Sequence, residues 1–272
     1  MNLHEGKIRI ANLENSNLED LIFVCSSQKL NDPIHQRGIN LKKRWLSRMM
    51  EEHGTCAKIA YYNQKPVAQI LYFSEEADVT RTSRRENVLV INCIYNPTPE
   101  AQKHGIGKTL LKSVIEDAKQ RKTCLGNKAC RFILAKAFNT GELVPLYDFY
   151  RKYGFKPTIE RDDLLYLPVE GFYEPAETVG EYKPLDEDKS KTIIFYNPIC
   201  QFSYPFAKTI EDIVKEVAPE TKTELINEWA KPDESIKRKN CQLIVNAKPI
   251  HTFFLETEKF KEEVKQAAES KT

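Results

Sequence analysis

The chain has 272 residues and a formal net charge of +2, so it is long enough for one large or two modest domains and lacks the basic excess of a nucleic-acid-binding protein. No apolar run could span a bilayer, and the first six residues lack the apolar core of a signal peptide. The seven cysteines are scattered through apolar runs and no His/Cys cluster has zinc spacing, which predicts a reducing cytoplasmic compartment, no disulfide framework and no metal site.

The first part of the chain alternates short strands with helices. In chain order the expected elements are a strand at residues 7–10, helices at 18–25 and 39–52, strands at 57–62, 67–73 and 88–95, a helix at 108–119 and a strand at 130–137. Asn17 is suited to cap the first helix, and Asn63, Gln64 and Lys65 are suited to the turn of a hairpin. This order predicts one α/β domain that ends near residue 169.

A loop with two glycines separates the strand at 88–95 from the helix at 108–119. We call it the glycine loop, and it consists of Gln102, Lys103, His104, Gly105, Ile106, Gly107 and Lys108. A helix N-terminus has backbone N–H groups without partners and a dipole that favours negative charge, and glycines let the backbone approach an anion closely. Together with the basic side chains of the loop, this arrangement predicts a site for a phosphate-rich group.

The spacing of the glycine loop decides between families of phosphate sites. A Walker loop needs four residues between its glycines, and here only Ile106 separates them; the dinucleotide fingerprint needs a third glycine where Leu110 stands. The remaining pattern, Q/R-x-x-G-x-G/A, closely resembles the pyrophosphate loop of the GNAT acetyltransferases. The alternative is a strand–loop–helix corner that holds no ligand.

A second motif follows the strand at 130–137. In residues 146–155, Gly154 is suited to end a helix in the left-handed region and Phe155 to begin the next strand. This segment resembles the Tyr-x-x-x-Gly-Phe signature of the same family. The resemblance implies that Tyr150 points at the thiol sulfur of coenzyme A, whereas a half-buried helix aromatic is the alternative. It also implies a polar cofactor contact at Asn139, although residues 140–144 look inserted.

The resemblance covers residues 1–169 and implies an acyl-CoA N-acyltransferase fold, α/β (α+β) with a mixed central sheet. It further implies acetyl-CoA as co-substrate and direct transfer to an amine within a ternary complex. The backbone at Ile94 and Tyr95 would pair with the pantetheine arm and place an N–H on the thioester carbonyl oxygen. Tyr150 would be the general acid for the departing thiolate, because a phenol with a pKa of about 10 is protonated at neutral pH.

The general base is not identified by the sequence. Many members of the family place a glutamate on the strand before the glycine loop, but here that strand offers Asn92 and Cys93. The nearby carboxylates are those of Glu75, Glu76 and Glu86, and a chain of water molecules is a further option. Cys93 could serve as a nucleophile, but a cysteine with apolar neighbours is more often inert core.

The acceptor is equally open, and we expect an amine of small size. In the family, the two helices near the N-terminus shape the acceptor pocket, which makes Arg44, Trp45 and Arg48 candidates; helix packing and surface charge are the alternative explanation for each. No run of acidic residues suits a polyamine or a basic protein tail. The sequence gives no indication of an oligomeric state.

Residues 170–190 are rich in Glu, Asp, Pro and Gly and are predicted to be a linker. Beyond it, residues 191–272 are predicted to form strands at 192–196, 223–229, 242–245 and 250–254, with helices ending near 217, at 235–239 and at 256–268. The order β-α-β-α-β-β-α is that of a minimal thioredoxin-like fold. An acetyltransferase followed by such a module resembles the YoaP type, and we expect the module to help choose the acceptor.

Two cysteines of the second module raise an alternative function. Cys200 and Ser203 occupy a turn that resembles the thioredoxin active-site turn, where a helix N-terminus would stabilise a thiolate, and Cys241 opens a neighbouring strand. The two sulfurs could form a disulfide, a soft-metal or metalloid site, or a thiol-binding pair, with the first domain as a CoA-sensing scaffold. Ser203 stands where a dithiol oxidoreductase needs its resolving cysteine. The other interpretation is two unrelated buried cysteines in a packing module.

Overall fold

The computed structural model describes residues 7–138, 144–177 and 179–270. The chain forms two compact units, each composed of several segments. The first comprises Met1–Gln28, Leu46–Asp78 and Ser83–Thr178, and the second comprises Lys29–Trp45, Val79–Thr82 and Val179–Thr272. The second module of the sequence therefore shares its unit with residues 29–45, which the sequence analysis places in the first domain.

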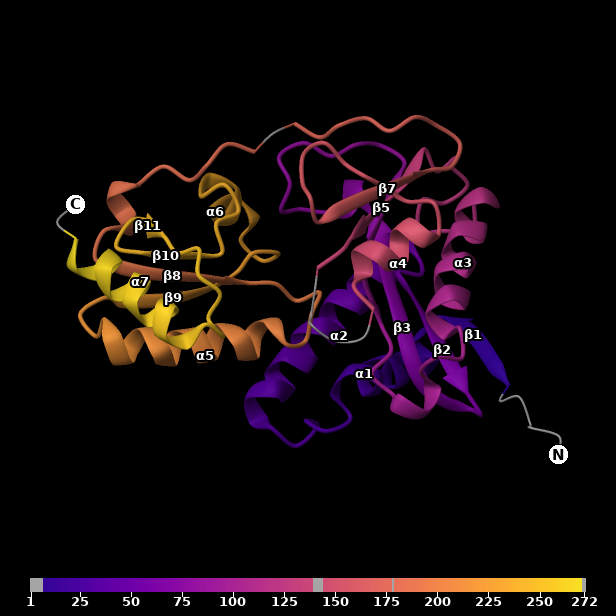
Figure 1. Ribbon diagram of the computed structural model, residues 1–272, viewed down its shortest axis with the longest axis horizontal. Coiled ribbons are helices and arrows are strands. Elements are labelled where there is room, and N and C mark those ends of the chain that lie inside the picture. The colour runs from indigo at the N-terminus through magenta and orange to yellow at the C-terminus, as the bar shows by residue number, and fades with distance from the viewer. Residues whose placement is uncertain (1–6, 139–143, 178, 271–272) are drawn as a thin grey trace. The chain divides into compact units, whose positions relative to one another are not determined.

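The first part of the chain forms a mixed α/β structure (Figure 1). Its elements are β1 (Ile8–Asn12), α1 (Leu18–Ser26), α2 (Pro33–His53), β2 (Ala57–Tyr62), β3 (Lys65–Ser74), β4 (Val88–Tyr95), α3 (Ile106–Lys119), β5 (Phe132–Lys136), α4 (Leu146–Lys152), β6 (Lys156–Pro157) and β7 (Leu164–Pro168). Among the described residues, its strands form one sheet in the order β1-β2-β3-β4-β5-β7-β6. Only β4 and β5 pair in parallel, and the other neighbours are antiparallel. The predicted mixed sheet is confirmed.

Local sequence signals explain several of these elements. Asn63 and Gln64 have φ of 49° and 68°, and two consecutive left-handed residues make the tight turn that suits the twist of a hairpin. The predicted turn is therefore confirmed. Asn17 occupies the predicted N-cap position of α1, but its side chain makes no capping hydrogen bond, because it donates to the carbonyl of Asn12 and accepts the N–H of Glu14. α2 begins six residues earlier than predicted, where Asp32 accepts the N–H of His35.

The two faces of this sheet have different partners. One face carries Leu89, Ile91 and Ile133, which share an apolar cluster with side chains of α3 and with Tyr150 of α4. The opposite face carries the alternate residues of the same strands, which form a separate cluster: Val88, Val90, Phe132, Leu134 and Leu164. Because side chains alternate along a strand, the position of each polar residue in β4 and β5 fixes the face on which it acts.

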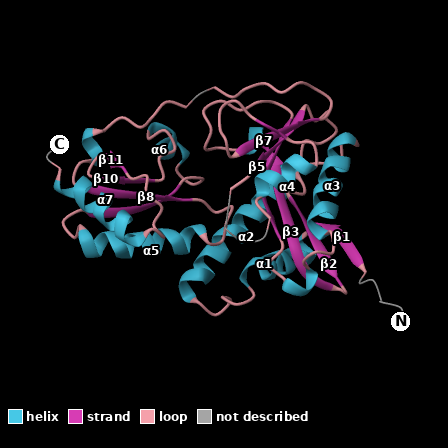
Figure 2. Ribbon diagram, viewed as in Figure 1, coloured by secondary structure: helices cyan, strands magenta, loops and turns pink. Residues whose placement is uncertain are grey.

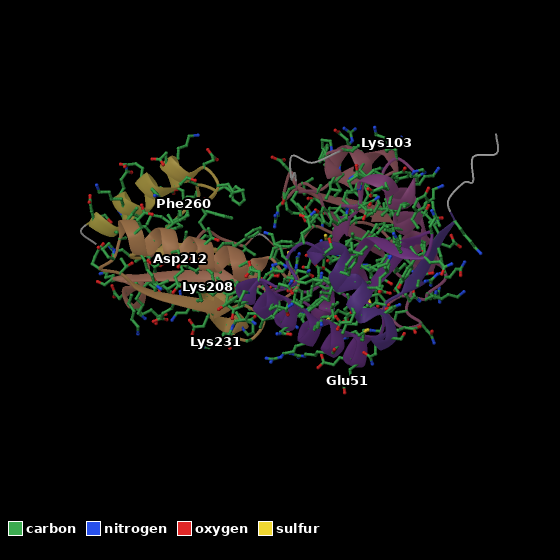
Figure 3. All side chains as sticks on the ribbon, turned by 90° about the horizontal axis from the view of Figure 1, so that it is seen from below. Glu51, Lys103, Lys208, Asp212, Lys231 and Phe260 are labelled. Atoms are coloured by element: carbon green, nitrogen blue, oxygen red, sulfur yellow. The ribbon has the colours of Figure 1, made fainter. Side chains whose placement is uncertain are left out.

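The second unit contains a smaller mixed sheet (Figure 2). Its elements are β8 (Lys191–Tyr196), α5 (Ser203–Val217), β9 (Lys222–Asn227), α6 (Pro232–Lys237), β10 (Leu243–Val245), β11 (Lys248–Pro249) and α7 (Thr257–Glu269). The described strands lie in the order β11-β10-β8-β9, with β8 and β9 parallel. Ile194, Val214 and Phe260 join the sheet to α5 and α7, and Phe260 and the exposed Asp212 are labelled in Figure 3. The predicted order of elements is confirmed.

The strand predicted at residues 250–254 is wrong. β11 consists only of Lys248 and Pro249, directly after a turn in which Asn246 and Ala247 have positive φ. The strand ends there because the carboxylate of Glu263 accepts the N–H groups of His251 (2.9 Å) and Thr252 (2.8 Å). Backbone donors bound by a side chain cannot continue a strand ladder.

The predicted linker is held to both units by its side chains. Tyr173 stacks on Tyr166 of β7 with ring centroids 4.0 Å apart, so its first part belongs to the first unit. In its second part, Asp188 is fully buried and accepts a 2.7 Å hydrogen bond from Arg238, which follows α6.

None of the helices in the described part of the chain combines the length and apolar character needed to cross a bilayer.

Candidate active site

The glycine loop leads from β4 into α3 and presents backbone donors at the start of the helix. Lys103 and Gly105 have φ of 64° and 72°, and the first turn of the helix is closed by the Thr109 N–H on the Gly105 carbonyl (3.0 Å). The N–H groups of the three residues before Thr109 therefore lie ahead of the helical ladder, where an anion can accept them. A lysine in the left-handed region is uncommon, and such backbone strain often accompanies a binding site.

The side chains of the glycine loop divide into two kinds. Lys103, His104 and Lys108 are exposed, with Lys103 labelled at the surface in Figure 3, and can add positive charge or donors around the helix N-terminus. Gln102 instead holds the loop, because its amide donates to the Asn96 carbonyl (3.4 Å). Ile106 is a core residue whose side chain is buried, so it can offer a ligand only its backbone.

Beyond the loop, β4 and β5 diverge. Their parallel pairing ends at the pair Ile91 and Ala135, whereas β4 continues to Tyr95. On its other edge, β4 stays paired with β3, and a bulge inserts Asn92 between the residues that pair with Leu71 and Tyr72. The part of β4 that contains Ile94 and Tyr95 therefore has an edge beyond its ladder with β5, where an extended ligand could pair with the backbone. Bulges of this kind are frequent next to active sites.

Tyr150 lies on α4 and is fully buried. Its hydroxyl has no hydrogen-bond partner among the described residues, and the rings of Phe149 and Phe155 lie 5.5 and 5.3 Å from its own. Burial, together with the nearby Cys93, raises the pKa of this phenol, so it is protonated at neutral pH. A buried hydroxyl without a partner costs about 1–3 kcal/mol, which is the expected state of a donor whose acceptor is a ligand.

The segment after Tyr150 confirms one local prediction. Gly154 has φ of 89° and follows the last turn of α4, and the Phe155 N–H donates to the Tyr150 carbonyl. This left-handed residue ends the helix in the way that glycine permits. Asn139, the other candidate cofactor contact near this motif, lies outside the described residues.

Two of the three candidate carboxylates near β4, those of Glu75 and Glu76, accept hydrogen bonds within the protein. Glu75 is fully buried and accepts two hydrogen bonds from the guanidinium of Arg85, at 2.7 and 2.8 Å, so it forms a structural ion pair and is removed from the candidate bases. Glu76 accepts the N–H of Asn87 at 3.1 Å, and Glu86 is exposed to solvent. This leaves the sheet without a buried free carboxylate among the three candidates.

The structure reveals a polar pair at the β4–β5 divergence that the sequence analysis missed. The ammonium of Lys136, the last residue of β5, donates to the side-chain oxygen of Asn92 at 3.1 Å. The available signal was a lysine that directly follows a buried apolar strand. A lysine at that point has to reach either solvent or a polar partner.

Two of the three candidate acceptor-pocket residues on α2 have ordinary structural roles. Trp45 is buried and packs edge-on against Trp229 at 5.4 Å within the second unit. Arg48 forms an exposed ion pair with Glu52, one helical turn away, at 2.9 Å. Arg44 is exposed. Packing and surface charge thus account for Trp45 and Arg48.

The turn that contains Cys200, residues 197–203, binds its own polar groups, and we call it the thiol turn. The hydroxyl of Ser203 accepts the N–H of Asn197 (2.9 Å), and the Asn197 side chain accepts the N–H of Ile199 (3.1 Å). Cys200 is exposed and Cys241 is partly buried, and both are free thiols. Burial raises the pKa of Cys241, which disfavours its thiolate.

No group of three or more His, Cys, Asp or Glu residues that could hold a metal ion occurs in the parts of the chain that the structure describes. Cys200 and Cys241 are both free thiols, and the Ser203 hydroxyl is bonded within the turn. The geometry therefore supports neither a disulfide nor a metal site formed by these two cysteines.

The comparisons with known proteins concern the first part of the chain. The sequence model of the acetyltransferase (GNAT) family matches residues 18–155, just over half of the chain. No curated protein matches the chain. Similar solved structures include the PaiA N-acetyltransferase from Thermoplasma acidophilum in complex with coenzyme A. It is 18% identical in sequence, the match covers 60% of this chain and 99% of that chain, and the TM-score is 0.42. A GNAT acetyltransferase from Brucella melitensis in complex with acetyl-CoA is 13% identical in sequence; the match covers 62% of this chain and 92% of that chain, and the TM-score is 0.41.

Proposed function

The chain belongs to the acetyltransferase (GNAT) family and is an acetyl-CoA-dependent acyltransferase, and on this premise we propose that it transfers the acetyl group directly to the amine of a small acceptor. The observation that carries the proposal is Tyr150, a fully buried phenol beside the β4–β5 divergence whose hydroxyl has no hydrogen-bond partner in the described parts of the chain. Its position supports a proton donor for a leaving group that arrives with the substrate. The glycine loop supports the site of the pyrophosphate.

Binding of the co-substrate would use backbone groups first. The N–H groups at the start of α3, with Lys103 and Lys108 beside them, would hold the pyrophosphate through charge-assisted hydrogen bonds. The backbone of β4 at Ile94 and Tyr95, beyond the ladder with β5, would pair with the pantetheine arm. An N–H of that edge would then donate to the thioester oxygen and stabilise the negative charge that develops there.

In the chemical step, the neutral amine attacks the thioester carbon, so that a C–N bond forms and the C–S bond breaks. Tyr150 gives its phenolic proton to the departing thiolate, and the proton lost by the amine passes to water and restores the phenol. Glu75 is paired with Arg85, and we therefore assign no carboxylate as base. The role of a base falls to water.

The first test is calorimetry with acetyl-CoA, followed by turnover of Tyr150→Phe. This variant should bind acetyl-CoA within about threefold of the wild type but lose about 10²- to 10⁴-fold in turnover, the usual contribution of a general acid. Its thermal stability should not fall, because the lost hydroxyl makes no hydrogen bond to any described residue. Tyr153→Phe, on the partly buried neighbour of Phe149, is the matched control. Unchanged turnover in Tyr150→Phe would remove the acid assignment, and no cofactor binding by the wild type would remove the function.

We also propose that residues 191–272 are a thioredoxin-like module that supports the acceptor side of the enzyme. The β-α-β-α-β-β-α order supports the fold, with the YoaP type as the expected relative. Within the second unit, the thiol turn packs against the first part of α2, since Phe202 and His35 have ring centroids 4.7 Å apart and Arg37 lies over Tyr204 at 5.4 Å. Family resemblance assigns that helix to the acceptor pocket. The seven free thiols support a cytoplasmic location.

A further inference from the structure

We propose that the side-chain oxygen of Gln69 accepts a hydrogen bond from the amine of the acceptor and orients this amine for attack on the thioester. The proposal rests on the proposed function and adds to it a residue that binds the nucleophile. It starts from a glutamine within the buried, largely apolar strand β3. Gln69 is 1% exposed, and its side-chain oxygen has no hydrogen-bond partner among the described residues.

The amide of Gln69 is held by its nitrogen. The Nε2 atom donates to the sulfur of Cys25 in α1 at 2.9 Å, so the oxygen is the end of the side chain that bonds to no described residue. A buried oxygen without a donor is unfavourable, and a ligand that brings a donor removes this cost. Because an amide oxygen can only accept, that ligand must present an N–H or an O–H group.

Strand register places this amide beside the backbone assigned to the co-substrate. Gln69 pairs with Tyr95 of β4, and directly paired residues have Cβ atoms about 4.5–5.5 Å apart on the same face of a sheet. Ile94 and Tyr95 lie beyond the ladder with β5, where the pantetheine arm would pair. Gln69 therefore lies next to the part of β4 at which the thioester would be held.

The two faces of the sheet separate this oxygen from the proton donor. Ala68 and Ile70, the neighbours of Gln69 in β3, belong to the apolar cluster that contains Tyr150. Because side chains alternate along a strand, Gln69 points to the opposite face, on which Cys25 contacts it. An amine held by Gln69 would thus reach the thioester from one face, while Tyr150 protonates the thiolate from the other.

A neutral amide oxygen suits an amine nucleophile. The lone pair of the amine has to point at the thioester carbon, so its N–H groups point elsewhere and need acceptors. As the C–N bond forms, the nitrogen becomes positively charged, and its hydrogen bond to Gln69 becomes charge-assisted and roughly twice as strong. A contact that is stronger in the transition state than in the ground state raises kcat. The amine still loses its proton to water, because the amide oxygen only accepts a hydrogen bond.

The same contact distinguishes primary from secondary amines. A primary amine has two N–H bonds, so one can stay on Gln69 while the other gives its proton to water. A secondary amine has a single N–H, which cannot do both. The enzyme should therefore prefer primary amines to their N-methyl derivatives, and Gln69 should be a source of this preference.

The experiment measures kcat and KM of the full-length protein for a panel of primary amines and their N-methyl derivatives. Gln69→Met replaces the amide by an apolar side chain of similar length. It should lower kcat for the primary amines about 10- to 100-fold and reduce their preference over the N-methyl derivatives, taken as the ratio of kcat/KM values, about tenfold. Gln69→Glu keeps an acceptor oxygen at this position and should retain most of the preference. Gln120→Met, at an exposed glutamine that follows α3, is the control and should match the wild type.

A second variant keeps the proposal testable if Gln69→Met does not fold. Cys25→Ala removes the sulfur that holds the amide nitrogen and should reduce the preference for primary amines several-fold. A wild-type preference in Gln69→Met, or in Cys25→Ala where Gln69→Met does not fold, overturns the proposal. Equal losses for primary and N-methyl amines in Gln69→Met would make Gln69 a structural residue and overturn it as well.

Calorimetry with acetyl-CoA on the same samples separates this proposal from the proposed function. Gln69→Met should bind acetyl-CoA within about threefold of the wild type, and a loss of binding would place the oxygen on the co-substrate and overturn the proposal. A wild type that binds acetyl-CoA but acetylates none of the primary amines would also overturn it. Failure of the proposed function differs from all of these results, because the wild type itself would then not bind acetyl-CoA.

Discussion

The two units each contain a turn between a strand and a long helix, and the two turns differ in what they do with their polar groups. After β4, the glycine loop leaves the N–H groups at the start of α3 ahead of the first helical bond, which Thr109 makes. After β8, the thiol turn uses the Ser203 hydroxyl and the Asn197 side chain to accept its own N–H groups. The glycine loop therefore keeps donors that a ligand could use, whereas the thiol turn uses those of Asn197 and Ile199 itself.

The largest effect should come from a negatively charged side chain in the glycine loop. Gly107→Glu places a carboxylate at the positive end of α3, where it repels the pyrophosphate, and should weaken acetyl-CoA binding by about 100-fold or more. Calorimetry measures the effect. Gly107→Ala is the matched control, because its Cβ would meet the Phe149 ring at 3.6 Å, an ordinary contact, and binding should stay within about threefold. Normal binding by Gly107→Glu would contradict the assignment of this loop.

A smaller effect is expected where the thiol turn packs on α2 within the second unit. A Cβ on Gly38 would collide with the backbone oxygen of Gln201, so Gly38→Ala should destabilise the protein by about 1–3 kcal/mol. Helix propensity alone would make the alanine variant more stable by about 1 kcal/mol, so a loss of stability can be attributed to the collision. Acceptor turnover should fall several-fold, with acetyl-CoA affinity unchanged.

Gly180→Ala is the control for Gly38→Ala, because its Cβ would meet no atom within 4 Å. Thermal unfolding and initial rates measure both variants. If Gly38→Ala is as stable and as active as the control, then the thiol turn does not support α2, and the role proposed for residues 191–272 loses its basis.

Removing the bond that closes the thiol turn should have a moderate effect. Ser203→Ala leaves the Asn197 N–H without its 2.9 Å acceptor and should cost about 1 kcal/mol in the free energy of unfolding. Acetyl-CoA affinity should not change. Ser47→Ala, at an exposed position of α2, is the comparison and should be neutral in chemical denaturation. An equal loss in both variants would show that the hydroxyl of Ser203 is not needed by the turn.

The smallest effect concerns pH and the histidine beneath the thiol turn. Burial, followed by the charge of Lys29, lowers the pKa of His35, with Asp32 acting in the opposite direction. The unfolded chain then binds a proton more readily than the folded one, so His35 contributes stability above its unfolded pKa of about 6.5 and this stability is lost as the pH falls. The slope should not exceed about 1.4 kcal/mol per pH unit.

Denaturation of His35→Gln between pH 7.5 and 5.5 measures the contribution of this histidine. The variant should show a flatter dependence of stability on pH than the wild type, whereas His251→Gln, at an exposed position, should follow the wild type. Identical curves for all three proteins would show that His35 titrates alike in the folded and unfolded chains.

The sequence by itself determined the elements and the local turns. The apolar run of β4, the turn at Asn63 and Gln64, the glycine loop and the helix end at Gly154 depend on patterning and on residues that tolerate left-handed φ, and these signals lie within a few residues of one another. The family signatures added the candidate phenol, Tyr150. The same local patterning wrongly predicted a strand at residues 250–254, because the backbone N–H groups there bind the carboxylate of Glu263.

Only the tertiary structure decided which polar groups are used and which remain for a ligand. Glu75 forms a buried ion pair with Arg85, the strand after Pro249 ends on the carboxylate of Glu263, and Lys136 meets Asn92 across 44 residues of sequence. The hydroxyl of Tyr150, in contrast, is buried and has no hydrogen-bond partner among the residues that the structure describes. These outcomes depend on strand register and burial, which bring together residues that no periodicity relates, because a hydrogen bond requires partners within about 3 Å wherever they lie in the chain.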